Sequence, residues 1–322
     1  MKYGFFVGLI IGTLFFSCKN DDDLDVEVIE ASLLSEVAPE DDAEIKEFLQ
    51  THFYNYEEFE TPPADFDYKI RIDTIAGDNA DKTALIDMVD NLKSASVNVS
   101  SDAFGLDDGE EDVAHTYYYL EARVGGGGSP TYADSTLLRY RGTLLDGTLF
   151  DENQTFSWQE LPFTIRGYAQ GISNFHAGTE DQIVENGDGT IEIANSGVGM
   201  FILPSGLAYF NSTPSILIPT YSILLFEVEI GAFIEDTDND NDGVPSILED
   251  LNGDGNLNND DTDEEDEINN FGFSVPNFQD ADDDGDGVST NDEITDDDGN
   301  IILPYPDSNN DGTPDYLDPD TN

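Results

Sequence analysis

The chain has 322 residues and 38% hydrophobic content, enough for two domains with apolar cores and a tail. Its 71 acidic residues outnumber 11 basic ones, which gives a formal net charge of -60. A field of this sign repels nucleic acid and anionic lipid headgroups, so it excludes nucleic acid as a partner and favours cations. Arg166 is the last Lys or Arg, so the chain beyond it is acidic or neutral.

Residues 1–17 have the pattern of a secretory signal peptide. Lys2 precedes an apolar run over 5–16, which is short for a membrane span. The run ends at Ser17-Cys18, which resembles a bacterial lipobox and implies lipidation of Cys18 as the first residue of the mature protein. The alternative is an ordinary signal peptide, or a membrane helix, with an incidental cysteine. Because Cys18 is the only cysteine, no disulfide forms within one chain.

Residues 18–38 are acidic and show no sustained period, so we expect them to form a tether. Within this segment, the acidic run 21–23 resembles the surface-export signal of some Gram-negative lipoproteins. That resemblance implies a lipid-anchored protein of the outer membrane, on its cell-surface face. An acidic linker on the periplasmic face would have the same composition.

The region 39–114 is predicted to be a small unit of mixed secondary structure. A helix is expected to begin at Asp41, because apolar residues recur on one face behind it and acids occupy its N-terminal end. Alternation over 68–75 predicts a strand, and a second helix is predicted over 82–92. These patterns assign no function to the region.

A β-rich domain is indicated over 115–234. Its central hairpin turns at Asp146-Gly147. Asp tolerates the backbone conformation of the first turn position, and Gly avoids the steric clash of a side chain at the second. Gly and Asn residues also mark a turn in an apparent insertion downstream. The predicted strands and hairpins are strand 116–124, hairpin 138–151, the inserted hairpin 183–193, and strands 200–203 and 224–230.

The central hairpin reads YRGTLLDGTLFD over 140–151. This resembles the Tyr-x-Gly-x-Leu-x-Asp-Gly-x-x-Phe-Asp signature of FKBP-type peptidyl-prolyl isomerases. Further motifs follow in the family's order, namely IRGYAQGI at 165–172, LAY at 207–209 and LLFEVEI at 224–230. Tyr168 stands where the family has Trp, and Phe210 replaces a glycine. The resemblance covers 115–234 and implies an α+β fold in which an antiparallel half-barrel sheet wraps on a short helix.

The same resemblance implies peptidyl-prolyl cis-trans isomerisation without a cofactor. Rotation about an X-Pro bond has a barrier of about 18 to 20 kcal/mol because the amide has partial double-bond character. An apolar pocket that removes water and holds the twisted amide lowers this barrier without a nucleophile. By the family's motifs, the pocket would be lined by Tyr140, Phe150, Asp151, Phe156, Ile165, Tyr168, Tyr209, Ile218 and Phe226.

Within that set, Asp151 would orient the polar side of the pocket, and the backbone amide of Ile165 would bond to the peptide. Tyr168 makes a narrower floor than Trp, which leaves open a domain that binds without turnover. The short loop between Asp151 and Phe156 also leaves open whether Trp158 is a further wall.

From 235 to 322 the chain has no Lys or Arg, and its acids are regularly spaced. Four segments place oxygen-bearing residues at positions 1, 3, 5 and 12 around a glycine at position 6, and calcium loops also use the carbonyl of position 7. The predicted ligands are Asp238, Asp240, Asp242, Val244 and Glu249 in the first loop, Asp250, Asn252, Asp254, Asn256 and Asp261 in the second, Asp282, Asp284, Asp286, Val288 and Glu293 in the third, and Asp307, Asn309, Asp311, Thr313 and Asp318 in the fourth.

Few apolar residues flank these loops, so paired helices of the EF-hand type are not expected. Segments such as GVPSILED at 243–250 resemble thrombospondin type 3 and related bacterial repeats. That resemblance implies that the chain wraps around structural Ca²⁺, which turns self-repulsion into coordination. A solvated polyanion without specific sites is the alternative.

Together these patterns predict a lipid-anchored envelope protein that isomerises proline-containing exported or outer-membrane polypeptides. The competing function is a non-catalytic FKBP-like subunit of an outer-membrane secretion or uptake complex. A third function, a calcium buffer or adhesin, would need the acidic tail to act without the central domain.

Overall fold

A computed structural model describes residues 31–187 and 189–321. The signal peptide predicted over 1–17, the lipidation site Cys18 and most of the tether lie outside this part of the chain. Within it, no helix is both long enough and apolar enough to cross a membrane.

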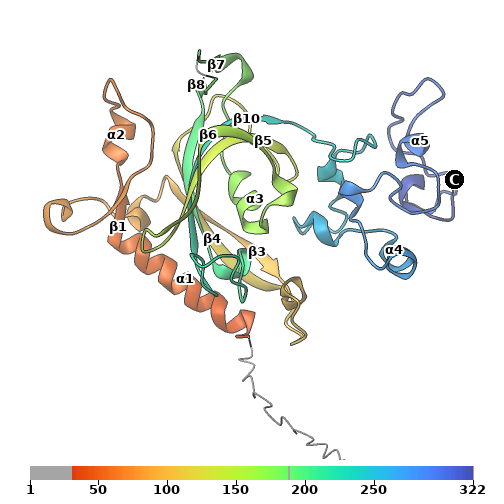
Figure 1. The fold of residues 1–322 in the computed structure, drawn as a ribbon, viewed down its shortest axis with the longest axis horizontal. Coiled ribbons are helices and arrows are strands. Elements are labelled where there is room, and N and C mark those ends of the chain that lie inside the picture. The colour runs from red at the N-terminus through yellow and green to blue at the C-terminus, as the bar shows by residue number, and fades with distance from the viewer. Residues whose placement is uncertain (1–30, 188, 322) are drawn as a thin grey trace, which may run out of the picture. The chain divides into compact units, whose positions relative to one another are not determined.

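A six-stranded antiparallel sheet forms the centre of the fold (Figure 1). Its strands lie in the order β3, β4, β9, β10, β5, β6, with the bounds β3 Leu92–Val99, β4 Val113–Arg123, β9 Gly197–Leu203, β10 Leu224–Ile234, β5 Ser135–Leu144 and β6 Leu149–Glu160. Every residue of β9 is buried, because this strand is paired on both sides and covered on both faces. We call residues 34–234 the sheet domain.

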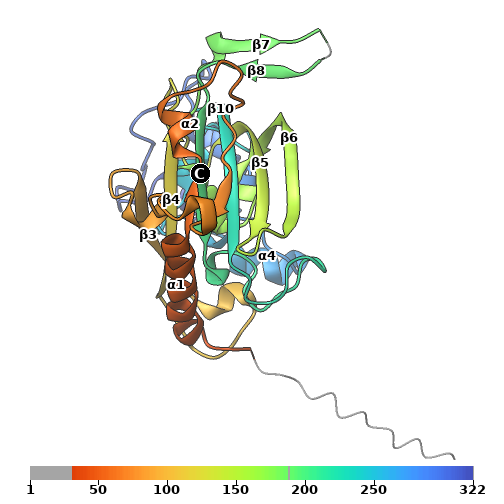
Figure 2. The same ribbon diagram turned by 90° about the vertical axis from the view of Figure 1, so that its left-hand side faces the viewer.

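One helix packs on each face of the sheet (Figures 1 and 2). Helix α3, Arg166–Ile172, packs on the face that carries Phe201 and Leu203. The long helix α1, Leu34–Thr51, packs mainly on the opposite face, against Met200 and Ile202. Successive β9 side chains therefore serve two apolar cores, as the two-residue period of a strand requires.

Smaller elements surround this core. β1 and β2 pair with each other, as do β7 and β8, which form the inserted hairpin predicted from the sequence. Their bounds are β1 His52–Tyr54, β2 Ile72–Thr74, β7 Ile183–Glu185 and β8 Ile191–Ile193, and the short helix α2 is Tyr56–Glu60. The Asp146-Gly147 turn is also confirmed, with Gly147 at φ 85°.

The N-terminal predictions need correction. α1 begins at Leu34, inside the predicted tether, because Leu34 and Val37 are buried against the sheet domain core. The strand predicted over 68–75 is reduced to Ile72–Thr74. The helix predicted over 82–92 is a single turn, Leu85–Asp87, with only Leu85 buried.

The strand β3 was not predicted. It lies in the region 39–114, yet it pairs along its whole length with β4, so the predicted boundary at residue 115 divides one sheet. Its sequence carries a short strand signal, because Ser96 and Asn98 are exposed while Ala95, Val97 and Val99 pack on the core. Lys93 and Ser94 interrupt the alternation before it.

The C-terminal module, residues 235–321, consists of loops, single-turn helices and the short helices α4, Glu264–Phe271, and α5, Thr290–Ile294. Its apolar side chains form two small groups. One contains Val244, Ile294 and Tyr316. In the other, Leu257 and Phe278 pack on Ala133 of the sheet domain, so the module is attached to the sheet domain by side-chain contacts.

Candidate functional site

A cavity of about 590 Å³ lies between β5, β10, α3 and the loop that precedes β10. Eight of the nine residues predicted for the isomerase pocket line it. They are Tyr140, Phe150, Asp151, Ile165, Tyr168, Tyr209, Ile218 and Phe226. The cavity is also lined by Gln159, Phe163, Thr164, Pro214 and Ser215, which were not predicted.

Aromatic rings form the floor and one wall of this cavity. Tyr168 is 4% exposed, and its ring centroid lies 5.0 Å from that of Phe226 and 5.8 Å from that of Tyr140. Phe150 meets Phe226 edge to face at 5.6 Å. Edge-to-face contacts of this kind fix ring orientations, so the cavity has rigid apolar walls.

The hydroxyl of Tyr168 has a partner that the sequence reading did not include. Its OH donates to Oε1 of Gln159 on β6 at 2.9 Å. Burial raises the pKa of Tyr168 well above its ordinary value, so the ring is neutral and remains a donor. The replacement of Trp by Tyr at this position therefore leaves no unpaired polar group. A buried tyrosine hydroxyl needs a hydrogen-bond partner, and this requirement could have led to Gln159 from the sequence.

The polar side of the cavity is formed by a hydrogen-bonded pair. Tyr140 donates its hydroxyl proton to Oδ2 of Asp151 at 2.6 Å. Burial and this hydrogen bond raise the pKa of Tyr140, and burial raises that of Tyr209. Asp151 is itself exposed, so a negative acceptor stands at the mouth of an otherwise apolar cavity.

A free backbone donor, the N–H of Ile165, lies on another side of the cavity. Ile165 is the N-cap residue of α3, and its backbone is extended at φ -64° and ψ 139°. Among the described residues its N–H has no acceptor, while its carbonyl accepts from Tyr168 and Ala169. A peptide carbonyl in the cavity could take this free donor.

Phe156 was assigned to the pocket and lies elsewhere. The β5–β6 register shifts between Leu138 and Tyr140, so residues 154–156 of β6 stand opposite Arg139 alone. This bulge turns Phe156 toward the inserted hairpin, where it packs near Ile193 with the Arg139 guanidinium 5.0 Å from its ring centroid. Trp158, whose register the sequence left open, is 49% exposed and does not line the cavity.

Phe210, which replaces a glycine of the family pattern, is accommodated by the core. Its backbone keeps a positive φ of 44°, a conformation that favours glycine. Its side chain is 1% exposed and packs on Phe104 and Tyr221, with ring centroids 4.9 and 5.1 Å away. The ring therefore does not line the cavity beside Tyr209.

A second cavity, of about 420 Å³, lies on the other face of the sheet, against residues 67–71. Its charged side chains are largely paired with each other, as Arg139 is with Glu229 at 2.6 Å and Arg71 with Asp67 at 2.8 Å. It offers no stacked aromatic walls, so the 590 Å³ cavity is the better match to an apolar peptide.

The four acidic loops of the C-terminal module share one hydrogen-bond pattern. In each, the carboxylate at position 5 accepts from the N–H at position 7, over 2.7 to 2.8 Å. The position 5 N–H donates to the side chain at position 3, and the position 6 glycine has a φ between 78° and 104°. The repeat seen in the sequence is thus a repeat of backbone structure.

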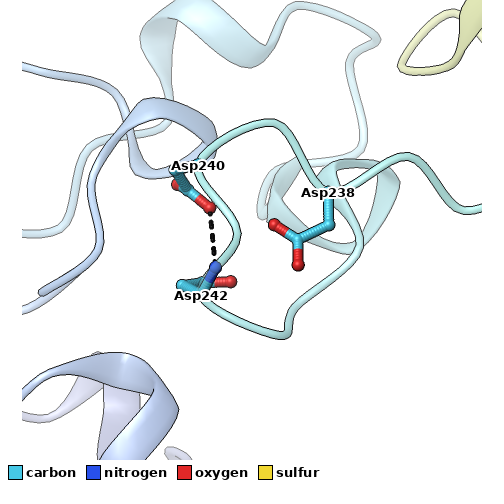
Figure 3. Close-up of side chains that lie close together, drawn as sticks. All are labelled: Asp238, Asp240 and Asp242. Atoms are coloured by element: carbon cyan, nitrogen blue, oxygen red, sulfur yellow. Dashed lines mark hydrogen bonds between the residues drawn. The ribbon is translucent and has the colours of Figure 1, made fainter.

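The first and third loops gather their carboxylates most closely. Figure 3 shows Asp238, Asp240 and Asp242 around one bend of the backbone, with Asp240 accepting from the Asp242 N–H at 3.3 Å. Carboxylate oxygens of these three residues lie within 4.8 Å of one another, as do those of Asp282, Asp284 and Asp286 in the third loop.

The position 12 residues of these two loops, Glu249 and Glu293, have buried carboxylate oxygens without donors among the described residues. Both carboxylate oxygens of Glu249 and of Glu293 lack a hydrogen-bond partner among the described residues. Burial, followed by the neighbouring aspartates, raises the pKa of Glu249 to about 9 and that of Glu293 to about 8. Oxygen-only ligands of this kind suit a hard divalent cation such as Ca²⁺.

The second and fourth loops differ from this arrangement. Asp250 accepts from the hydroxyl of Tyr132, and Asp254 pairs with Arg166 of α3 at 3.6 Å. Asp261 groups with Asp263 and Glu267, which lie outside the loop pattern. In the fourth loop Asn309 donates to Asp318 at 2.7 Å, so the residues at positions 3 and 12 bond to each other.

Comparisons with known proteins match the two regions separately. Residues 239–306 match the family model described as BamM C-terminal. A probable FKBP-type 25 kDa peptidyl-prolyl cis-trans isomerase of Pseudomonas aeruginosa is 27% identical over 113 residues, 35% of this chain and 42% of the relative. The isomerase FkpA of Aeromonas hydrophila is 27% identical over 169 residues, 51% of this chain and 53% of the relative. The chain thus spans about half the length of the curated relatives it matches.

Two solved structures are also similar. One is a peptidyl-prolyl isomerase of Pseudomonas syringae, 24% identical, with 37% of this chain and 76% of the other covered at a TM-score of 0.30. The other is FkpA of Escherichia coli, 25% identical, with 37% and 48% covered at a TM-score of 0.30. Because both TM-scores are low, the homology to FKBP-type isomerases rests on the sequence matches, at low identity and over part of the chain.

Proposed function

We propose that this protein is a peptidyl-prolyl cis-trans isomerase of the FKBP type that acts on exported or outer-membrane polypeptides. The observation that carries the proposal is the 590 Å³ cavity, in which eight residues of the family pattern come together. Homology at low identity to FKBP-type isomerases supports the reaction class.

The cavity accounts for the reaction without a cofactor. The prolyl ring of the substrate binds on the Tyr168 floor of the cavity, in contact with Phe226, and loses its hydration water. Loss of water from the X-Pro carbonyl destabilises the planar amide relative to the twisted one. The free N–H of Ile165 then holds a carbonyl of the substrate, and the Tyr140–Asp151 pair orients the polar side.

The first test is prolyl-peptide isomerisation by the purified chain and by Asp151→Asn. We expect the wild type to accelerate the reaction and the substitution to lower kcat/KM by about tenfold, since it removes a charge-assisted hydrogen bond at the site. Asp146→Asn, in the exposed turn of the same hairpin, is the matched control and should leave the rate unchanged. No acceleration by a folded wild type would refute catalysis.

A second function is favoured by one comparison. The match of residues 239–306 to the BamM C-terminal family supports a role as a non-catalytic, FKBP-like subunit of an outer-membrane complex. Such a subunit would co-purify with membrane proteins and would keep that association in Asp151→Asn. Turnover and co-purification together distinguish the two functions.

For the C-terminal module we propose structural Ca²⁺ sites in the acidic loops. Support comes from the shared loop geometry and from the buried carboxylates of Glu249 and Glu293, which lack donors within the described chain. For the N-terminus we propose an outer-membrane lipid anchor on Cys18 and a position on the cell-surface face, the periplasmic face being the alternative.

A further inference from the structure

A group of three carboxylates lies between the first and third acidic loops. Oxygens of Asp242, Glu249 and Asp283 lie within 4.8 Å of one another. Asp242 and Glu249 are positions 5 and 12 of the first loop. Asp283 is position 2 of the third loop, where the loop pattern has no ligand. The group therefore joins segments that the repeat pattern treats as separate sites.

Each of these three side chains is buried, at 1% exposed. Oδ2 of Asp242, both carboxylate oxygens of Glu249 and both of Asp283 have no hydrogen-bond partner among the described residues. Carboxylates that lose water without gaining donors are strongly destabilising unless a cation or a proton compensates them. The group thus requires a positive partner that the neighbouring residues do not supply.

The surrounding contacts hold the two loops in this position. Asn291 of α5 donates from Nδ2 to the carbonyl of Asp242 at 2.8 Å. The backbone N–H of Asp283 donates to Oγ1 of Thr290 at 3.2 Å. Val244 and Ile294 pack together beside the group. These contacts keep the carboxylates together even though their mutual repulsion opposes it.

We propose that Asp242, Glu249 and Asp283 jointly bind one divalent cation of the Ca²⁺ class, which ties the first loop to the third. This inference rests on the calcium module proposed above and adds Asp283 as a ligand. Opposite oxygens on a Ca²⁺ ion stand about 4.8 Å apart, because each Ca–O distance is about 2.4 Å. The absence of nitrogen and sulfur ligands in the group disfavours zinc and copper.

The experiment compares the thermal stability of the purified chain with that of Asp283→Asn, both in EDTA and in millimolar calcium. In EDTA the substitution should raise the melting temperature of the module, because a neutral amide at this buried position needs no cation to compensate it. In calcium it should lower the melting temperature relative to wild type, and calcium affinity should fall on the order of ten- to a hundredfold. A purely packing role would shift both melting temperatures in the same direction and contradict the proposal.

Asp297→Asn is the matched control, because Asp297 is exposed in the same module and lies outside the loop pattern. If calcium does not stabilise the wild type, the calcium module itself is refuted. If calcium stabilises the wild type and Asp283→Asn behaves like Asp297→Asn, only the shared site is refuted. Failure of Asp283→Asn to fold in EDTA would also count against the shared site, since the substitution removes a buried carboxyl group that needs compensation there.

Discussion

The sheet domain and the C-terminal module bury different kinds of side chain. The sheet domain buries aromatic and aliphatic side chains on both faces of one sheet, and two of its buried polar side chains, Tyr168 and Asp41, have hydrogen-bond partners. The module has only small apolar groups and buries carboxylates without donors. An apolar core is stable in water by itself, whereas a buried group of like charges needs a ligand.

Removal of calcium should give the largest difference in stability between the two regions. In EDTA we expect the module to lose much of its stability while the sheet domain keeps its own, since the module contains carboxylates, such as those of Glu249 and Glu293, that are buried without donors among the described residues. Hydrogen exchange followed by mass spectrometry would show fast exchange over 236–321 and protected amides in β9. Equal protection of the module with and without calcium would contradict the expectation.

Truncation of an aromatic wall should affect the sheet domain next most strongly. Phe226→Ala removes a side chain that is 5% exposed and contacts four other rings, so we expect a loss of about 3 to 5 kcal/mol in the free energy of unfolding. Urea unfolding in calcium measures this loss. Trp158→Ala, at a half-exposed position, should cost much less, and equal costs would show that the cavity wall is not part of the core.

A buried carboxylate in the sheet domain gives a pH test. Asp41 accepts from the N–H and the hydroxyl of Ser205 at 2.7 Å each, yet burial outweighs these bonds and raises its pKa from 3.8 to about 6. A carboxyl whose pKa is raised on folding contributes stability below pH 3.8 that is lost as the pH rises through about 6. The loss is about 3 kcal/mol by linkage, at about 1.4 kcal/mol per pKa unit.

Asp41→Asn should therefore flatten the dependence of unfolding free energy on pH between 4 and 7, measured by urea titration at several pH values. Asp65→Asn, at an exposed position, should leave the slope as in wild type. An unchanged slope in Asp41→Asn would place the proton uptake on another group.

The smallest effect is expected from the hydroxyl at the floor of the cavity. Tyr168→Phe leaves Gln159 without its donor and should cost about 1 to 2 kcal/mol in unfolding free energy. Tyr209→Phe removes a hydroxyl at the rim of the same cavity, where water can replace any lost contact, and should be near neutral. Equal costs for the two substitutions would show that the Tyr168–Gln159 bond is not stabilising.

The sequence predicts the elements whose signal is local. The apolar strand segments of β9 and β10, the Asp146-Gly147 turn and the acidic loops can each be recognised from residues a few positions apart. The edge strand β3 has only a short signal, the alternation of apolar and polar residues over 95–99, and its pairing with β4 extends the strand back to Leu92.

Parts of the two sites also depend on residues distant in sequence. The prediction that Phe156 lines the pocket was wrong because the β6 bulge is set by pairing with β5, and no local sequence motif indicates this bulge. Gln159 and Asp283 were missed for a related reason. Each acquires its role only when folding brings it to a buried group elsewhere, Tyr168 in one case and Glu249 in the other.

The edge strands of the central sheet determine whether other extended chains can pair with it. Edge strands with unpaired backbone groups capture other extended segments, unless charge, polarity or bulges prevent it. Both edges here carry such protection: β3 exposes Lys93 and Asn98, and β6 is interrupted by register shifts and exposes Glu152 and Gln154. Under the proposed isomerase function, these edges would direct contact with unfolded clients to side chains in the cavity and away from strand addition, which is a route to aggregation.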